Sequence, residues 1–359
     1  MPGNYTKYQL VKEGLLRLIL ENRYSGGAIL PSESALAKQF GVSLITVRRA
    51  LSDLEGENVI HKKKGKGSFV KEIVTKAPQE KKISIIIQSQ VDKDSIFALL
   101  QGMQTYLVER NYSTEVYYSE MHIEEEHKYL QKFLNSKNDG LICFSVDPEQ
   151  SYPYFRKMLD SGRHFVLIDR GLEYHAMTNF VSCDNFSGGF QTADFLISLG
   201  HTDIAFISVY PHITAEKLRL NGYRNALKNH NINPRPELII SISRAGELPG
   251  LIREYGITAI QCVNDTMASA VMGILLENGF HIPKDISIFG FDNSVICKHM
   301  PVKLSTVTQP FHEIGATAAQ LIDEVIEKNL QTKCQLFLPV ELKLRNSHGP
   351  KPAALFQSM

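Results

Sequence analysis

The chain has 359 residues, 43% of them hydrophobic, so it is long and apolar enough to bury a large core. Residues 1–82 hold 15 Lys and Arg against 8 Asp and Glu, a net charge of +7, and the remaining residues carry a net charge of −6. The near-neutral total of +1 therefore hides a basic first part, whose charge suits binding to nucleic acid. Five cysteines without a CxxC pair argue against a disulfide scaffold, and the lack of a hydrophobic N-terminal segment disfavours a secreted or membrane protein, which predicts a cytoplasmic one.

Two short helices are predicted between residues 31 and 51. "PSESALAKQF" supplies an apolar face, and in "GVSLITVRRAL" Ser43 caps a second helix whose apolar residues recur at helical spacing. Thr46, Arg48 and Arg49 fall largely off that apolar stripe. Joined by "GV", the helices form a helix-turn-helix that presents Ser43, Thr46 and Arg48 to a DNA major groove. An ordinary helical hairpin with solvated arginines would share the pattern.

The stretch after Ile60, "HKKKGKGSFV", predicts a two-stranded wing with a cationic tip. Gly65 and Gly67 let the backbone approach a phosphate closely, and the lysines supply an attraction that is independent of sequence. Basic runs are often solvated faces, but this one directly follows the two-helix unit, as a winged helix-turn-helix requires.

Residues from about Tyr5 to Val70 resemble the GntR regulators, on the motifs "LPSE", "FGVS", "TVRRAL" and "GKGSFV" at the family's spacing. The resemblance implies that Glu33, Thr46, Arg48 and the wing face DNA. Where the family usually has arginine after the capping serine, this chain has Leu44, which offers only apolar contact, for example to a thymine methyl. The predicted DNA-binding residues are Glu33, Ser43, Leu44, Thr46, Arg48, Arg49, Lys64, Gly65 and Lys66.

Beyond the winged helix-turn-helix, predicted for residues 1–70, the polar segment 71–82 is predicted to be a linker. From Ile83 the chain alternates apolar runs such as "ISIIIQS" and "FVLID" with amphipathic stretches, which predicts an α/β fold of two doubly wound parallel sheets with helices on both faces. The predicted domain spans residues 83–346. Its N-subdomain covers about 83–175 and 310–331, its C-subdomain about 176–309 and 332–346, and a frayed tail takes 347–359.

Polar residues follow several of these apolar runs, at the positions where parallel strands end and ligands bind. They are Asp169 and Arg170, Asp184 and Asn185, Asn264 and Asp265, Asp292 and Asn293, and Gln309. Each alone is also a good turn former or helix cap. Together they predict a pocket for a polyhydroxylated molecule, because carboxylates accept from hydroxyls while amides both donate and accept.

Residues from about Lys82 to Asn346 resemble the effector domain of the LacI/GalR repressors, on "CDNFSGGFQTADFLISLGH", "RLNGYRNAL", "VNDTMASAVM", "IPKDISIFGFDNS" and "LSTVTQP". The resemblance implies a fold like that of periplasmic sugar-binding proteins, dimer contacts through this domain, and a ligand-contacting set. The chain lacks the tryptophan that often stacks on the sugar in this family, so Phe97, Phe186 or a tyrosine must serve instead. The predicted effector-binding residues are Phe97, Asp169, Arg170, Arg219, Asn264, Asp292 and Gln309.

Enzyme and metal chemistry find little support in the sequence. It contains no GxGxxG, P-loop, nucleophile elbow or HExxH motif, and the spacing of "HIEEEH" at residues 122–127 is not a recognised ligand pattern. We therefore expect no catalytic residues, no metal and no cofactor.

The sequence predicts a DNA-binding transcriptional regulator, acting as a homodimeric repressor on a pseudo-palindromic operator. A neutral sugar is the expected effector, with arabinose suggested because a GntR head on a LacI-type body resembles the arabinose repressors. Effector binding would change the closure of the cleft and so the presentation of the two DNA-binding heads, an allosteric coupling. The alternatives are a carbohydrate-binding protein with no DNA role, an enzyme of sugar metabolism, and a regulator that responds to a sugar phosphate or purine.

Overall fold

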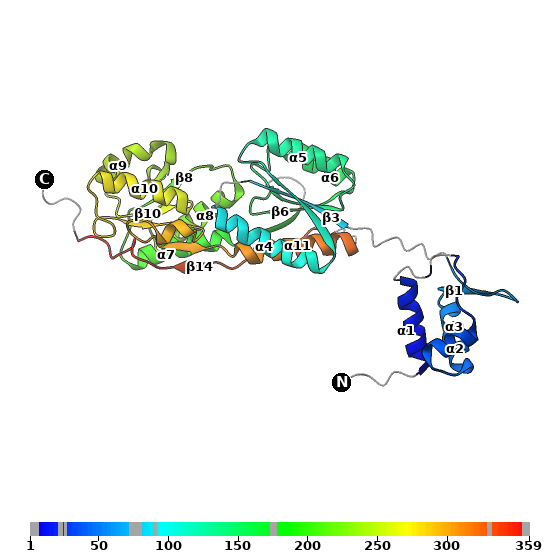
Figure 1. Cartoon of the computed structure of the whole chain (residues 1–359). Helices are drawn as coiled ribbons and strands as arrows, with labels where there is room; N and C mark the ends of the chain where they lie inside the picture. Colours follow the sequence, from blue (N-terminus) through cyan, green and yellow to red (C-terminus); the bar gives the residue numbers. More distant parts are fainter. Residues whose placement is uncertain are drawn as a thin grey trace. The chain divides into compact units, whose positions relative to one another are not determined.

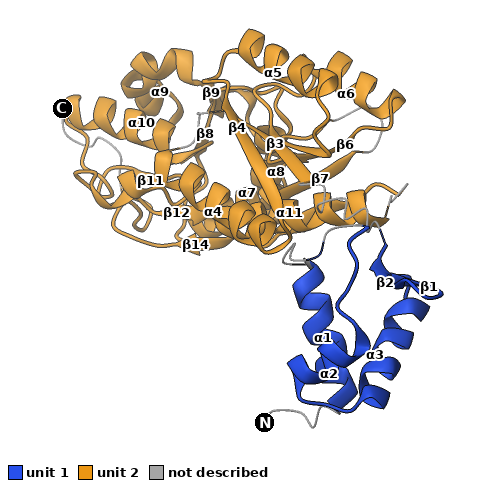
Figure 2. Ribbon diagram, turned by 45° about the vertical axis from the view of Figure 1, so that its right-hand side comes forward, with its two compact units in different colours: residues 1–79 blue, residues 80–359 orange. Residues whose placement is uncertain are grey.

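The computed structural model describes residues 7–20, 24, 27–71, 81–88, 92–172, 178–328 and 332–353. They belong to two compact units, residues 1–79 and 80–359, which are coloured separately in Figure 2. Within these ranges, no helix has the length and apolar character needed to cross a membrane.

The first unit is a winged helix-turn-helix, as predicted. Ser32 and Ser43 cap the second and third helices by accepting from Ala35 N and Thr46 N, and Gly41, with a left-handed φ of 63°, makes the turn between them. Leu15, Leu36, Leu51 and Leu54 meet in its core. The elements are α1 (Lys7–Leu20), α2 (Glu33–Phe40), α3 (Leu44–Gly56) and the antiparallel wing strands β1 (Ile60–Lys63) and β2 (Gly67–Val70).

The second unit contains a six-stranded parallel sheet in the order β13-β7-β6-β5-β3-β4. Its strands are β3 (Lys81–Ile87), β4 (Tyr112–Tyr118), β5 (Gly140–Phe144), β6 (His164–Ile168), β7 (Asn179–Cys183) and β13 (Gln335–Leu338). Helices α4 (Lys93–Glu109) and α11 (Phe311–Lys328) cover one face, and α5 (Ile123–Asn135) and α6 (Tyr152–Asp160) cover the other (Figure 1). Strands buried on both faces explain the continuous apolar runs.

A second, four-stranded parallel sheet has the order β11-β10-β8-β9. Its strands are β8 (Ile204–Ser208), β9 (Ile239–Ser241), β10 (Ala259–Cys262) and β11 (Ser287–Phe289). Helices α7 (Asn185–Ser198) and α8 (Thr214–Asn229) pack on one face, and α9 (Leu248–Tyr255) and α10 (Asp265–Glu277) on the other. A short antiparallel pair, β12 (Thr306–Thr308) and β14 (Glu341–Lys343), and 3₁₀ turns at Pro236–Leu238, Ile242–Glu247 and Val295–Lys298 complete the unit.

The predicted fold class is confirmed, but the predicted subdomain bounds are wrong for two strands. Strands β7 and β13 lie within the segments 176–309 and 332–346 that we assigned to the C-subdomain, whereas the structure pairs β13 with β7 and β7 with β6 in the first sheet. The error has a physical reason: an apolar run indicates a buried strand but not the sheet in which it finds its partner. The chain therefore passes between the two halves after Cys183, near Gln309 and near Pro339.

The ends of the second unit also differ from the prediction. Lys81 and Lys82, assigned to the linker, begin β3 and pair with β4; residues 72–80 lie outside the described ranges. The first part of the tail is packed rather than frayed, because the buried Ser347 donates to Ile288 O at 2.6 Å and the ring of His201 contacts Gly349 O at 3.0 Å. Residues 354–359 lie outside the described part of the chain.

Candidate DNA-binding surface and effector cleft

A groove on the first unit gathers six of the predicted DNA-binding residues. It is lined by the start of α2, one face of α3 and the tip of the wing, including Glu33, Leu44, Arg48, Lys64, Gly65 and Lys66. Arg48 Nε donates to Glu33 Oε2 at 2.7 Å, which holds the guanidinium beside Leu44, itself 44% exposed. Several wing lysines and one oriented arginine around a shared groove suit phosphate attraction and the reading of a base edge.

The other three predicted DNA-binding residues have structural contacts outside this groove. Ser43 Oγ accepts from Thr46 N at 3.3 Å and lies 2.8 Å from Thr46 Oγ1, so both hydroxyls are used in capping. The guanidinium of Arg49 lies over the ring of Tyr8 at 4.2 Å, on the side of α3 that faces α1. Ile45, 77% exposed, is a further surface residue of α3 that the sequence analysis passed over, although its position opposite the buried Val47 and Leu51 could have revealed it.

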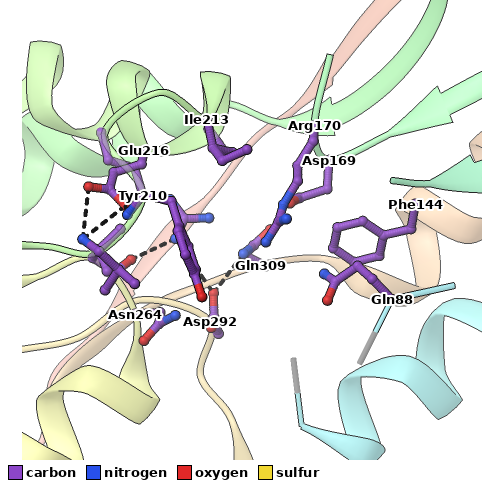
Figure 3. A pocket seen from close by; sticks show the side chains of 14 residues that line it. Gln88, Phe144, Asp169, Arg170, Tyr210, Ile213, Glu216, Asn264, Asp292 and Gln309 are labelled. Carbon is purple, nitrogen blue, oxygen red and sulfur yellow. Dashed lines mark hydrogen bonds and ion pairs between the residues drawn. The ribbon is translucent and has the colours of Figure 1, made fainter. Parts of the chain in front are cut away.

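A cleft lies in the second unit, where strands of both sheets end (Figure 3). Six of the seven predicted effector residues line it: Asp169, Arg170, Arg219, Asn264, Asp292 and Gln309. Its other lining residues are Gln88, Phe144, Val209, Tyr210, Ile213, Ala215, Glu216 and Val263. The cleft therefore brings together polar residues that were predicted from strand ends and that lie more than 100 positions apart in the sequence.

Arg219 is the most firmly oriented of these side chains. Its Nε donates to Asn185 Oδ1 at 2.7 Å, its Nη1 donates to Val263 O at 2.6 Å, and its guanidinium lies 3.7 Å from the centre of the Phe291 ring. Helix α8 reaches this position because it crosses α7 at two glycines. A Cβ at Gly189 would lie 2.1 Å from Arg219 O. A buried, fixed guanidinium is a ready donor for a ligand oxygen.

Two carboxylates face the same space. Gln309 Nε2 donates to Asp292 Oδ1 at 2.7 Å, and Arg219 Nη1 lies 3.9 Å from that oxygen. Burial raises the pKa of Asp292 well above its usual range, against the opposing charge of Arg219. Asp169 Oδ1 is buried with no hydrogen-bond partner among the described residues, and its backbone has a left-handed φ of 62°. A buried carboxylate oxygen without a partner is an acceptor available to a ligand.

Some polar residues at strand ends serve the fold as well as the cleft. Asn264 Oδ1 caps α10 by accepting from Met267 N at 2.9 Å, and Asp184 caps α7 by accepting from Ser187 N at 2.9 Å. Asp265 is fully buried beneath the cleft, where Ser294 and Thr306 donate to it. Asp184 is thus a helix cap that does not line the cleft, whereas Asn264 both caps a helix and lines the cleft.

The predicted aromatic contact is wrong for Phe97. That side chain is 67% exposed on α4 and lies in a shallow surface groove with Leu100 and Val108, away from the cleft residues. Phe186 does not line the cleft either. The aromatic lining comes from Phe144 and Tyr210, which the sequence analysis did not name. Both sit at or just after a strand end, so the rule that found the polar residues would also have found them.

Comparison with known protein families agrees with this division. Residues 7–70 match the gntR family of bacterial regulatory proteins, and residues 193–348 match the periplasmic binding protein-like domain. The two matches correspond to the unit that carries the basic groove and to much of the unit that carries the cleft.

Individual relatives match this chain over most or much of its length. The arabinose metabolism transcriptional repressors of Halalkalibacterium halodurans and Geobacillus stearothermophilus are each 29% identical to this chain, over 90% and 95% of it and 90% and 97% of their own lengths. The regulator DegA of Bacillus subtilis is 30% identical over 63% of this chain and 69% of its own. The transcription regulator CcpA of Lactococcus lactis, 23% identical, has the same fold over 75% of this chain and 99% of its own, with a TM-score of 0.68. The chain therefore belongs to the helix-turn-helix transcriptional regulators in which a DNA-binding domain of the gntR family precedes a periplasmic binding protein-like domain.

Proposed function

We propose that the protein is a repressor that leaves its operator when a neutral sugar binds in the cleft. The sugar proposal rests on the polar side chains that line the cleft together with Arg219, namely Asp169, Asn264, Asp292 and Gln309. Among them, Asp169 Oδ1 has no hydrogen-bond partner among the described residues. Hydroxyl groups of a sugar satisfy such a set, since each can donate to a carboxylate and accept from an amide or guanidinium.

The charge of the cleft favours a neutral ligand over a phosphorylated one. Two basic side chains, Arg170 and Arg219, and two acidic ones, Asp169 and Asp292, line the cleft, so their formal charges sum to zero. Glu216 adds no free acceptor, because its oxygens accept from Ser208 Oγ and from the backbone N–H groups of Val209 and Tyr210. A phosphate beside the two aspartates would meet like charge in a poorly solvated site.

A pentose such as arabinose is the leading candidate, supported by the names of the full-length relatives. Isothermal titration calorimetry of the full chain with L-arabinose, and with D-ribose beside ribose 5-phosphate, tests both the class and the charge argument. We expect the neutral sugar of that pair to bind more tightly, and the sugar that binds to release the protein from operator DNA in a mobility-shift assay. Tighter binding of ribose 5-phosphate would contradict the proposal.

We propose that the lysines of the wing bind the phosphate groups of the DNA backbone. We expect Lys66→Ala to weaken binding to all DNA sequences alike and to reduce the slope of log affinity against log salt by about one, because one exposed cation at the wing tip is removed. Fluorescence anisotropy at several salt concentrations measures this slope. Lys12→Ala serves as the control, since Lys12 already pairs with Glu57 at 2.5 Å; an unchanged slope for Lys66→Ala would contradict the phosphate contact.

We further propose that the second unit forms the homodimer, with the outer face of α4 as the contact. Phe97 and Val108, 67% and 61% exposed, lie with Leu100 along one face of this helix, an unusual density of exposed apolar side chains. A charge in this face would be desolvated on assembly, so we expect Val108→Glu to sediment as a monomer at micromolar concentration while the parent is a dimer. Gln104→Ala on the same face is expected to remain dimeric, and a dimeric Val108→Glu would exclude α4 as the contact.

A further inference from the structure

Two loops from opposite halves of the second unit meet beside the cleft. Asp147 follows β5 of the six-stranded sheet, and His212 follows β8 of the four-stranded sheet. His212 Nε2 lies 3.1 Å from Asp147 Oδ2. Next to this pair, Thr214 Oγ1 accepts from Gly171 N at 3.1 Å and lies 3.2 Å from Gly171 O, to which its hydroxyl donates. These contacts join the two halves directly.

Each loop is anchored in its own half by a buried glutamate. Glu126 accepts from Ser145 Oγ and Ser151 Oγ, both at 2.5 Å, and from Val146 N, so it fixes the loop that carries Asp147. Glu216 accepts from Ser208 Oγ and from Tyr210 N, the latter at 2.7 Å, so it fixes the base of the loop that carries His212. The two loops are therefore held rigidly enough to present Asp147 and His212 to each other.

The loop that carries His212 also forms a wall of the cleft. Tyr210 and Ile213 line the cleft, whereas Asp147, His212 and Thr214 do not. The rings of Tyr210 and His212 meet edge to face, 6.2 Å apart. Opening the cleft at this wall requires separation of His212 from Asp147 and of Thr214 from Gly171, although none of these residues touches the space where a ligand would lie.

We propose that Asp147, His212, Thr214 and Gly171 form a latch that holds the cleft closed without contacting the effector. The effector part of this inference rests on the proposed function. The latch makes effector affinity depend on residues outside the binding site, because a ligand that binds the closed form gains from every contact that favours closure.

Asp147 is the acceptor of the contact with His212. Asp147 is 7% exposed; burial would raise its pKa, but hydrogen bonds from Gln150 and the nearby His212 outweigh this and lower the pKa. His212, 55% exposed, faces Asp147 and the Tyr210 ring, and the buried Arg170 donates to Val146 O in the loop that carries Asp147. The lowered pKa keeps the Asp147 carboxylate ionised, so it can accept from His212 Nε2.

Hydrogen–deuterium exchange of the full chain without sugar tests the latch independently of the effector. We expect the amide of Gly171 to exchange several-fold faster in Thr214→Val, which removes its acceptor, and the 209–214 loop to exchange faster in His212→Gln. His230→Gln is the matched control, because His230 pairs with Asp194 at 2.7 Å within one half. Circular dichroism confirms that each variant is folded.

Calorimetry of the same proteins with L-arabinose tests whether the latch changes the affinity for the effector. We expect His212→Gln to bind about threefold more weakly than the parent, because one partly exposed contact that favours the closed cleft is lost. His230→Gln should keep the affinity of the parent.

The two arms separate failure of the latch from failure of the proposed function. Equal exchange of parent, Thr214→Val and His212→Gln, with and without sugar, would overturn the latch even if arabinose binds tightly. If the parent binds no sugar, the proposed effector class fails, and the sugar-free exchange alone decides the latch. Faster exchange confined to the two latch variants supports it in either case.

Discussion

Arg48→Ala is expected to abolish specific operator binding, leaving the variant with only its affinity for random DNA. Arg48 is 64% exposed at the groove shared by α2, α3 and the wing, and Glu33 fixes its guanidinium at 2.7 Å. One bidentate contact to a base edge is worth about 1–3 kcal/mol, and the proposed dimer would lose it at both half-sites. Removal of Arg48 also leaves the Glu33 carboxylate without this counter-charge in the groove that we propose faces DNA. Fluorescence anisotropy with operator and scrambled DNA measures the difference.

Arg49→Ala is the matched control for this experiment. It removes the same charge from the same helix, but the Arg49 guanidinium lies over Tyr8 and outside the groove. We expect it to retain the preference for operator over scrambled DNA. Operator binding by Arg48→Ala as tight as that of the parent would refute the assignment of α3 as the reading helix.

Asp292→Ala is expected to weaken effector binding roughly ten- to hundredfold, corresponding to about 1–3 kcal/mol for buried polar partners left unsatisfied. Gln309 Nε2 loses its acceptor and Arg219 Nη1 loses the carboxyl oxygen 3.9 Å away. Because Asp292 has a left-handed φ of 119°, alanine also adds backbone strain, whereas asparagine tolerates such angles better. Asp292→Asn therefore separates the loss of the carboxyl group from the loss of backbone fit, and calorimetry with the bound sugar measures both variants.

Asp194→Asn provides the control for Asp292, since Asp194 is an exposed carboxylate that pairs with His230 away from the cleft. Its effector affinity should equal that of the parent. Unchanged affinity in Asp292→Ala, with the fold intact by circular dichroism, would mean that the sugar does not bind against this carboxylate.

The polar residues of the cleft could be selected from the sequence because the topology of parallel sheets determines where their strands end. In a parallel sheet the strands end at one edge, so Asn264 and Asp292 lie together at the edge of the four-stranded sheet. Asp169 lies at the corresponding edge of the six-stranded sheet, which lines the same cleft. Local chemistry was equally readable in the first unit, where Ser43, Gly41 and the wing glycines each have a conformational reason for their position.

Non-local relations were beyond the sequence pattern. Phe97 was misplaced because helical spacing does not reveal which side of α4 turns toward α11, and β7 and β13 were misassigned because strand pairing depends on partners far along the chain. Tyr210 was missed for a different reason, since the strand-end rule was applied only to polar residues and β8 ends at Ser208, two positions before it. The approach of His212 to Asp147 depends on two loops from different sheets, and neither loop predicts the other.

The glycine contact between α7 and α8 has a mechanical consequence. A Cβ at Gly189 or Gly222 would lie 2.1 Å from a carbonyl oxygen of the opposite helix, and one at Gly102 or Gly315 would lie 2.0 Å from a carbonyl oxygen across the α4–α11 crossing. Backbones in such direct contact cannot slide past each other without collision, so each helix pair moves as a single stiff plate. A displacement of Arg219, which lies on α8, therefore moves α7 together with α8, because neither helix of the pair can shift without the other.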